Sequence, residues 1–155
     1  MRLCPWIFVL ALVFQPEGWL PAVTPAYAGN ELKGLKKMRI NIVIGDRKIP
    51  ASLNNSQASK DFVGLLPLTL ELKDYASKEK VSDLPAKLSV VGSPEGSSAR
   101  KGDIAFYAPW GNLAIFYHDH GFASGLIKLG QLDDADALPV QTAPYQARFE
   151  IAADK

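Results

Sequence analysis

The sequence predicts a mainly β domain, built as a small antiparallel barrel or sandwich. Apolar and polar residues alternate with a period of two in several short runs, which is typical of half-buried strands. Turn-forming residues separate these runs, and one convincing helical pattern interrupts them. A closed barrel is the more attractive arrangement because closure leaves no exposed sheet edge.

The first part of the predicted domain is a hairpin followed by a short helix. Residues 38–44 and 48–53 alternate as two strands, and Gly45-Asp46 between them is typical of a turn. Three side chains that can cap a helix come next: Asn54, Asn55 and Ser56. Apolar residues then recur at helical spacing before Pro67 ends the helix: Ala58, Phe62, Leu65 and Leu66.

The remaining strands follow this helix. Leu68, Leu70 and Leu72 alternate with polar residues as a strand with one buried face. The polar segment 74–83 is expected to contain a helical turn around residues 77–81. Residues 92–102 are rich in Gly, Ser and Pro and predict an exposed, mobile loop. Further strands are expected at 87–91, 104–108, 113–118, 126–132 and 147–152.

The first 28 residues have the layout of a secretory signal peptide. Arg2 precedes a short apolar run at residues 6–14, and Ala26-Tyr27-Ala28 is typical of a cleavage site. A membrane anchor is the weaker alternative, because a spanning helix needs about 20 apolar residues. Cleavage after Ala28 would leave residues 29–155 as one domain, located in the periplasm or secreted, with no membrane as a partner.

Charge and cysteine content narrow the classes of function. The formal net charge of +1 gives no electrostatic argument for binding nucleic acid or an anionic membrane surface. Cys4 is the only cysteine, and it lies in the expected signal peptide. Residues 29–155 therefore have no disulfide, thiolate metal site or cysteine nucleophile, and their stability must come from a packed core.

A series of short motifs runs from residue 38 to residue 132. Its members are Arg39-Ile40-Asn41-Ile42-Val43-Ile44-Gly45, Asn54-Asn55-Ser56-Gln57-Ala58-Ser59-Lys60-Asp61-Phe62, Leu65-Leu66-Pro67-Leu68-Thr69-Leu70, Asp74-Tyr75, Glu79-Lys80, Leu84-Pro85, Gly102-Asp103-Ile104, Tyr107-Ala108-Pro109-Trp110-Gly111-Asn112, Phe116-Tyr117 and Gly125-Leu126-Ile127-Lys128-Leu129-Gly130. In order and spacing the series resembles the bacterial cyclophilin-like fold family, small proteins of unknown function. The resemblance implies a closed eight-stranded antiparallel β-barrel with one or two short helices, but a fold does not fix a function.

The leading candidate for a binding site is the turn between the strands at 104–108 and 113–118. Aromatic rings with polar tips and an amide gather there: Tyr107, Trp110, Asn112 and Tyr117. Rings supply contact area and the amide supplies oriented hydrogen bonds, as in many ligand pockets. The alternative is that Trp110 packs over one end of the barrel and Asn112 only forms the turn.

Two other groups of polar residues are candidate sites. Glu79 is an acid–base or ligand-binding candidate if it is buried near the aromatic turn, and otherwise belongs to a solvated helical turn. His118 and His120 share one face of a strand, but further metal ligands would have to come from elsewhere in the fold. We therefore predict no metal site, no cofactor and no catalytic residue.

These observations favour a non-catalytic module that binds a small molecule or an extended peptide. The resemblance also suggests a peptidyl-prolyl isomerase, but true cyclophilins carry Phe-His-Arg and Gln-Gly-Gly-Asp-Phe segments that this sequence lacks. A hydrolase-like activity using Glu79 is a further enzyme alternative. The third class of function is a structural or partner-binding envelope protein. Such a protein would present an exposed apolar patch without a pocket.

Overall fold

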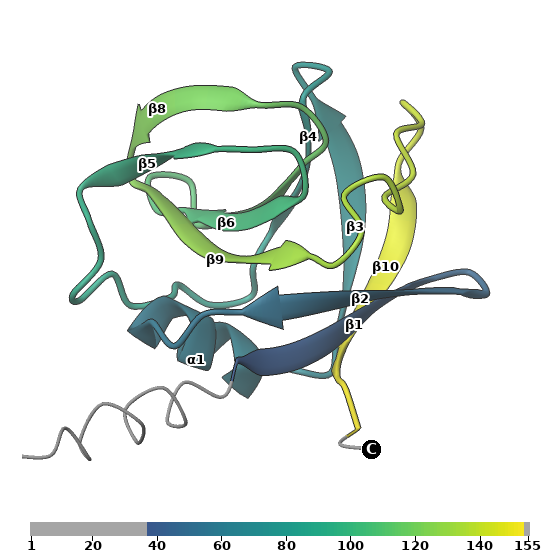
Figure 1. The fold of residues 1–155 in the computed structure, drawn as a ribbon, viewed down its shortest axis with the longest axis horizontal. Coiled ribbons are helices and arrows are strands. Elements are labelled where there is room, and N and C mark those ends of the chain that lie inside the picture. The colour runs from purple at the N-terminus through teal and green to yellow at the C-terminus, as the bar shows by residue number, and fades with distance from the viewer. Residues whose placement is uncertain (1–36, 154–155) are drawn as a thin grey trace, which may run out of the picture. The chain divides into compact units, whose positions relative to one another are not determined.

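The computed structural model describes residues 37–153, which form a closed β-barrel (Figure 1). Around the barrel the strands follow the order β1-β10-β3-β4-β7-β6-β9-β2, and each neighbouring pair is antiparallel. Their bounds are β1 Met38–Ile44, β2 Arg47–Leu53, β3 Leu68–Tyr75, β4 Glu79–Asp83, β6 Asp103–Tyr107, β7 Asn112–Phe116, β9 Leu126–Leu132 and β10 Tyr145–Ile151. The prediction of a closed eight-stranded antiparallel barrel is confirmed.

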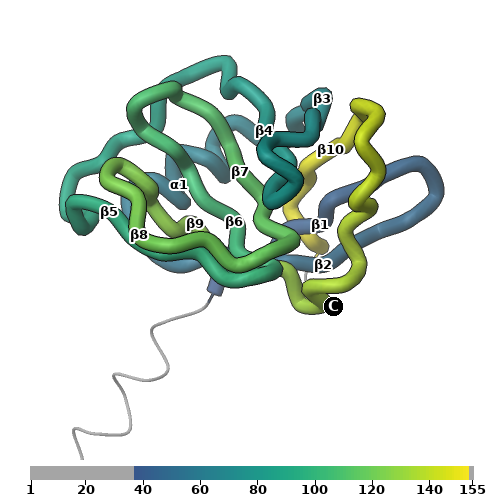
Figure 2. The backbone as a smooth tube through the Cα atoms, turned by 90° about the horizontal axis from the view of Figure 1, so that it is seen from above, coloured from purple at the N-terminus to yellow at the C-terminus, as the bar shows by residue number. Residues whose placement is uncertain are grey.

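Three elements complete the described part of the chain. Helix α1 (Gln57–Gly64) follows the β1–β2 hairpin, and Ser56 is its N-cap. Strands β5 (Gly96–Ala99) and β8 (His120–Ser124) pair with each other outside the barrel, on the side of β6 and β9 (Figures 1 and 2). The expected signal peptide, residues 1–28, lies outside the described residues. Within residues 37–153 no helix is long and apolar enough to cross a membrane.

Three local predictions were wrong. The segment 74–83 contains no helical turn: β3 runs to Tyr75 and β4 starts at Glu79, with Ala76 and Ser77 at φ of 51° and 53° in the tight turn between them. The cross-strand pairing of β3 with β4 takes precedence over the polar composition of this segment. Residues 87–91 form no strand, whereas the expected loop 92–102 contains β5.

The barrel interior is filled by alternate residues of its strands. Each strand directs every second side chain inward, so that Ile40, Leu72 and Phe149 are fully buried. Phe62 of α1 closes the core by packing edge-on against Phe149, with ring centroids 5.8 Å apart. This main cluster supplies the packed core that a chain without disulfides needs, and a second, smaller cluster that includes Ala114 and Phe116 lies outside the barrel.

A bulge in β9 connects the barrel to α1. The register with β6 shifts between Ile104 and Ala105, leaving Leu129 as the extra residue. The Leu129 carbonyl accepts hydrogen bonds from the Asn54 backbone N–H at 2.8 Å and from the Ser59 hydroxyl at 2.9 Å. Residues at and just before the start of α1 therefore donate hydrogen bonds to the carbonyl of the bulged residue Leu129.

The β5–β8 pair is held close against the barrel. The Gly125 carbonyl accepts from Ala108 N–H at 2.9 Å, and the Ser97 hydroxyl donates to the Leu126 carbonyl at 2.9 Å. A Cβ on Gly125 would lie 2.7 Å from the Pro109 ring, and φ there is +78°, so this position requires glycine. The pair thus forms a wall beside the outer face of β6 and β7.

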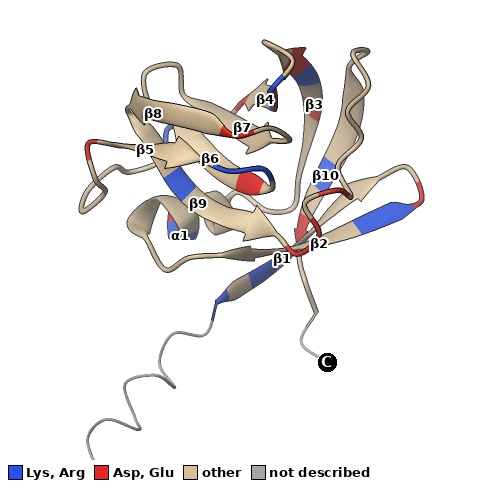
Figure 3. Ribbon diagram, turned by 45° about the horizontal axis from the view of Figure 1, so that its top comes forward, with Lys and Arg blue, Asp and Glu red and all other residues tan. Residues whose placement is uncertain are grey.

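Charged side chains are spread over the fold and do not form one large patch of a single sign. Lys, Arg, Asp and Glu residues are scattered over the described strands and loops (Figure 3), in keeping with the formal net charge of +1. Several of them pair locally, as Arg39 does with Asp133 at 2.5 Å.

Candidate functional site

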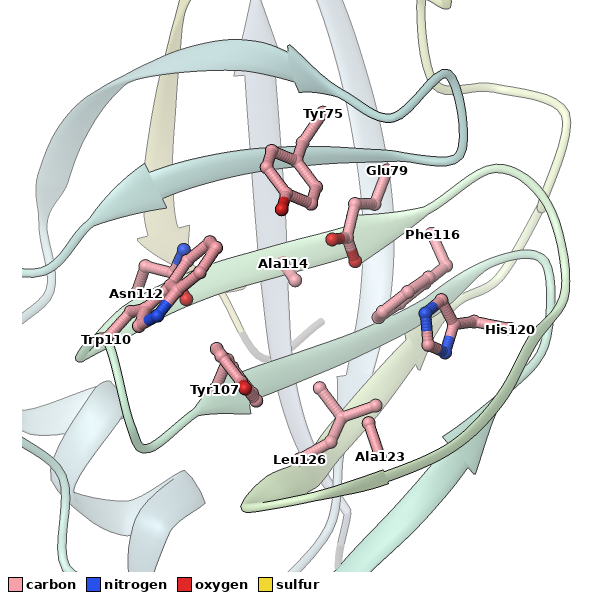
Figure 4. Close-up of a pocket in the computed structure, with 10 residues that line it drawn as sticks. All are labelled: Tyr75, Glu79, Tyr107, Trp110, Asn112, Ala114, Phe116, His120, Ala123 and Leu126. Atoms are coloured by element: carbon pink, nitrogen blue, oxygen red, sulfur yellow. The ribbon is translucent and has the colours of Figure 1, made fainter.

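A cavity of about 220 Å³ lies between the outer face of the barrel and the β5–β8 pair. Strand β7 explains its position, because Asn112, Ala114 and Phe116 point outward while Leu113 and Ile115 enter the core. Ala114 is small and lies between two larger side chains, so the strand face is hollowed at its middle (Figure 4). Ala123 of β8 and Leu126 at the start of β9 provide apolar walls.

Three aromatic residues line one side of this cavity. Trp110 packs edge-to-face against Tyr75 and against Tyr107, with centroid distances of 5.6 and 5.3 Å and interplanar angles of 87° and 81°. Trp110 is nevertheless 59% exposed and Tyr75 is 44% exposed. An exposed pair of large rings beside a cavity is available for contact with a ligand.

The turn that carries Trp110 is fixed by backbone hydrogen bonds. The Tyr107 carbonyl accepts from Trp110 N–H at 3.2 Å and from Gly111 N–H at 2.9 Å, and Gly111 has a φ of +73°. The Gly111 carbonyl in turn accepts from Leu84 N–H at 3.2 Å. The indole is therefore presented by an anchored turn rather than by a free loop.

The polar side chains of the cavity are Asn112, Glu79 and His120, besides the tyrosine hydroxyls. Asn112 is 5% exposed, and its Oδ1 is buried without a hydrogen-bond partner among the described residues. Most buried polar atoms in proteins are paired, so a buried acceptor without a partner in a residue that lines a cavity is unusual.

Glu79 reaches the cavity from β4. It pairs across the sheet with Phe116 on one side and with Tyr75 on the other, and is half-buried. Burial raises the pKa of its carboxyl, while the nearby His120 lowers it. Figure 4 shows the carboxylate directed into the cavity between Tyr75 and Phe116.

The structure brings four of the five predicted site residues together: Glu79, Tyr107, Trp110 and Asn112. Tyr117 lies elsewhere, because an odd separation along a strand places two side chains on opposite faces. Its ring is 7% exposed, and its hydroxyl donates to Asp74 Oδ1 at 2.7 Å. With Asp74 and His118 it borders a second hollow of about 400 Å³.

The prediction that His118 and His120 share one face of a strand was wrong, because β7 ends at Phe116 and β8 starts at His120, which leaves His118 in the connection between them. His118 faces the second hollow, whereas His120 at the start of β8 faces the aromatic cavity. His120 Nδ1 lies 2.7 Å from the Gly121 carbonyl. Residues 37–153 contain no group of three or more His, Cys, Asp or Glu side chains placed to hold a metal ion.

Six of the lining residues were not predicted from the sequence: Tyr75, Ala114, Phe116, His120, Ala123 and Leu126. The period of two along β7 was sufficient to select Ala114 and Phe116 once Asn112 was chosen. Tyr75 and His120 depend on the β3–β4 register and on the docking of β8, for which the sequence has no local signal.

Comparison with known proteins gives a family but no activity. The model of the cyclophilin-like family matches residues 42–151, which is most of the chain. A hypothetical protein of Archaeoglobus fulgidus, whose structure was determined in solution, is similar with a TM-score of 0.56 and 16% identity, covering 76% of this chain and 97% of that one. No curated protein matches. The chain therefore belongs to the cyclophilin-like family.

Proposed function

We propose that this cyclophilin-like domain is an exported binding module that takes a small molecule, or a side chain of an extended peptide, into the aromatic cavity. Export rests on the signal-peptide pattern of residues 1–28. Binding rests above all on Asn112, whose buried Oδ1 has no partner among the described residues. Leaving such a group unpaired costs about 1–3 kcal/mol, a cost that a ligand with an N–H or O–H donor removes.

Size and lining support a ligand of limited bulk. A volume of about 220 Å³ is below the roughly 300–1,000 Å³ of sites for drug-sized molecules. It suits one ring, one short chain or one side chain. The exposed Trp110 and Tyr75 would cover such a group at the opening.

Prolyl isomerisation is the less favoured function of this site. Cyclophilin-type catalysis needs an arginine to donate toward the prolyl nitrogen, and none of the ten residues lining the cavity is arginine. The exposed arginines Arg39 and Arg47 donate instead to Asp133 and to the Ala137 carbonyl. Glu79 is the one lining side chain that, when ionised, can only accept hydrogen bonds, which suits recognition of a donor.

The experiment is a fragment titration of the full chain, with neutral, cationic and anionic fragments and with proline-containing tetrapeptides. Tryptophan indole N–H signals report where binding occurs. Trp110 is the one tryptophan of residues 29–155, and a Trp110→Phe variant identifies its signal where Trp6 and Trp19 of the expected signal peptide are still attached. Fragments that occupy the cavity shift the Trp110 signal and leave the other two unchanged. If no probe shifts it, the proposed function is wrong.

Calorimetry of Trp110→Ala tests the same proposal by affinity. Removal of a central aromatic contact is expected to weaken binding about tenfold or more, while circular dichroism shows an unchanged barrel because the side chain is largely exposed. Phe122→Ala is the matched control, since Phe122 is 68% exposed on β8 and does not line the cavity. Equal loss in both variants, or no loss in Trp110→Ala, would contradict the assignment.

A further inference from the structure

We propose that the ligand of the aromatic cavity is an elongated organic cation, with an ammonium group beside Glu79 and an N–H or O–H donor beside Asn112. This inference rests on the proposed binding function and names the chemistry of its ligand. Two acceptors without partners, at opposite ends of one aromatic cavity, carry it.

The first end is set by the charge of Glu79. Its carboxylate is half-buried, and within residues 37–153 it has no ion pair or hydrogen-bond partner. No Lys or Arg lines the cavity, and His120 is the one lining side chain that can carry positive charge. Burial raises the pKa of Glu79, which means that the empty cavity disfavours the charged carboxylate. A bound ammonium would supply the missing counter-charge.

The second end is set by the amide of Asn112. Its unpartnered Oδ1 accepts hydrogen bonds and cannot donate them, so it selects a ligand N–H or O–H group. The positions of Asn112 and Glu79 in the sheet keep the two ends of the cavity apart. Asn112 lies four residues along β7 from Phe116, the cross-strand partner of Glu79, which is about 13 Å between Cα positions. One compact group cannot contact both ends, and a short chain can.

The path between the ends is lined by rings and by small apolar side chains. Tyr75 is the cross-strand neighbour of Glu79, and its ring also contacts Trp110 at the Asn112 end. Ala114 is the floor between them (Figure 4). Aromatic faces attract cations, so the rings would also contribute to the binding of an ammonium group. The lining therefore suits an alkyl chain that ends in a positive charge.

The test compares three probes of nearly equal size by calorimetry on the full chain. Protonated aminopentanol has both groups, pentanediol lacks the charge, and pentylammonium lacks the second donor. Aminopentanol is expected to bind about tenfold more tightly than either of the others, and to shift the indole signal of Trp110. Equal affinities for aminopentanol and pentanediol would overturn the cationic ligand and leave the binding module intact.

Variants assign the two ends separately. Glu79→Gln keeps the shape of the side chain and should reduce aminopentanol affinity to that of pentanediol, which it leaves unchanged. Glu71→Gln is the matched control, because it removes the same charge from an exposed site on β3 that already pairs with Lys73 at 3.3 Å. Asn112→Leu should lower the affinity for aminopentanol to that for pentylammonium. Unchanged aminopentanol binding in Glu79→Gln would refute the proposal.

Two further probes distinguish a free amine from a lysine side chain. Nα-acetyl-lysine methylamide and Nα-acetyl-norleucine methylamide share a backbone. Only the lysine derivative carries a side-chain ammonium group. If the lysine derivative binds more tightly than aminopentanol and the norleucine derivative does not, the cavity takes a lysine of an extended peptide. If aminopentanol binds more tightly, the ligand is a free amine. If none of the probes, nor any fragment of the wider panel, shifts the Trp110 signal, the binding function fails with the inference.

Discussion

Glu79 and Lys80 are neighbours on β4, yet the structure treats their charges in opposite ways. Lys80 points into the barrel, is 0% exposed, and donates to Asp74 Oδ1 at 2.7 Å and to the Gln141 carbonyl. Its ammonium also lies 5.3 and 5.8 Å from the ring centroids of Tyr117 and Tyr145. Glu79 points outward into a cavity and has no such partner among the described residues.

The same contrast separates the polar groups on the two faces of β7 and the strands beside it. Inside, the hydroxyl of Tyr117 and the ammonium of Lys80 share one carboxylate, Asp74. Outside, Asn112 and Glu79 line the cavity, and the Asn112 Oδ1 and the Glu79 carboxylate have no hydrogen-bond partner among the described residues. The inner network contributes to the stability of the barrel, whereas we propose that the outer groups contact a ligand. On that proposal, stability and binding are divided between the two faces of one sheet.

Loss of the inner charge should have the largest effect on stability. Lys80→Met keeps an apolar chain of similar length but leaves Asp74 without its cation, and we expect a loss of roughly 2–3 kcal/mol, because one partner of a buried pair remains uncompensated. Urea unfolding followed by circular dichroism measures it. Glu79→Gln, one residue away, should leave the free energy of unfolding almost unchanged. Equal losses in the two variants would remove the distinction between the faces.

A smaller effect should distinguish two tyrosines. Tyr117→Phe deletes the 2.7 Å hydrogen bond to Asp74 and should cost about 1–2 kcal/mol, since the acceptor is charged. Tyr107→Phe removes a half-buried hydroxyl that lines the cavity, and its stability should change by less than about 0.5 kcal/mol. Thermal unfolding of both variants gives the comparison. A larger loss in Tyr107→Phe would show that the outer hydroxyl also stabilises the fold.

The sequence was sufficient for the barrel because the barrel depends on local patterns. Alternation marked the hairpin of β1 and β2, and capping residues followed by helical spacing marked α1. The family resemblance supplied the closure and the strand number. The errors at 74–83 and 92–102 have one origin: β4 and β5 are short and polar, and each becomes a strand only through its partner. Composition alone does not contain that pairing.

The candidate site was predictable in part for the same reason. Tyr107, Trp110 and Asn112 lie on one turn, so nearness in sequence was enough to group them. Tyr117 was added by the same nearness, although strand alternation places it on the opposite face from Asn112. Glu79 was chosen on its chemistry, but Tyr75 and His120 come from strands whose register is set by the whole fold.

Carboxyl titration gives the finest test of the division between the faces. The hydrogen bond from Lys80, with one from Tyr117, holds the pKa of Asp74 below its usual value of 3.8. Burial holds the pKa of Glu79 above its usual value of 4.5. Carbon NMR of both carboxyl groups across the acid range should therefore show Asp74 losing its proton at lower pH than Glu79. A Glu79 that titrates below 4.5, the usual value, would mean that a cation already partners it.

The two shifts act on stability with opposite signs. Asp74 is an acid with a depressed pKa in the folded state, so its contribution is present above pH 3.8 and is lost as the pH falls through the lower folded value. Glu79 is an acid with a raised pKa, so the folded state loses stability as the pH rises from 4.5 through the higher folded value. Asp74→Asn should flatten the acid limb of the stability curve, and Glu79→Gln should remove the small decline above it. An ammonium ligand bound beside Glu79 should also remove that decline, because it favours the charged carboxylate that burial alone opposes.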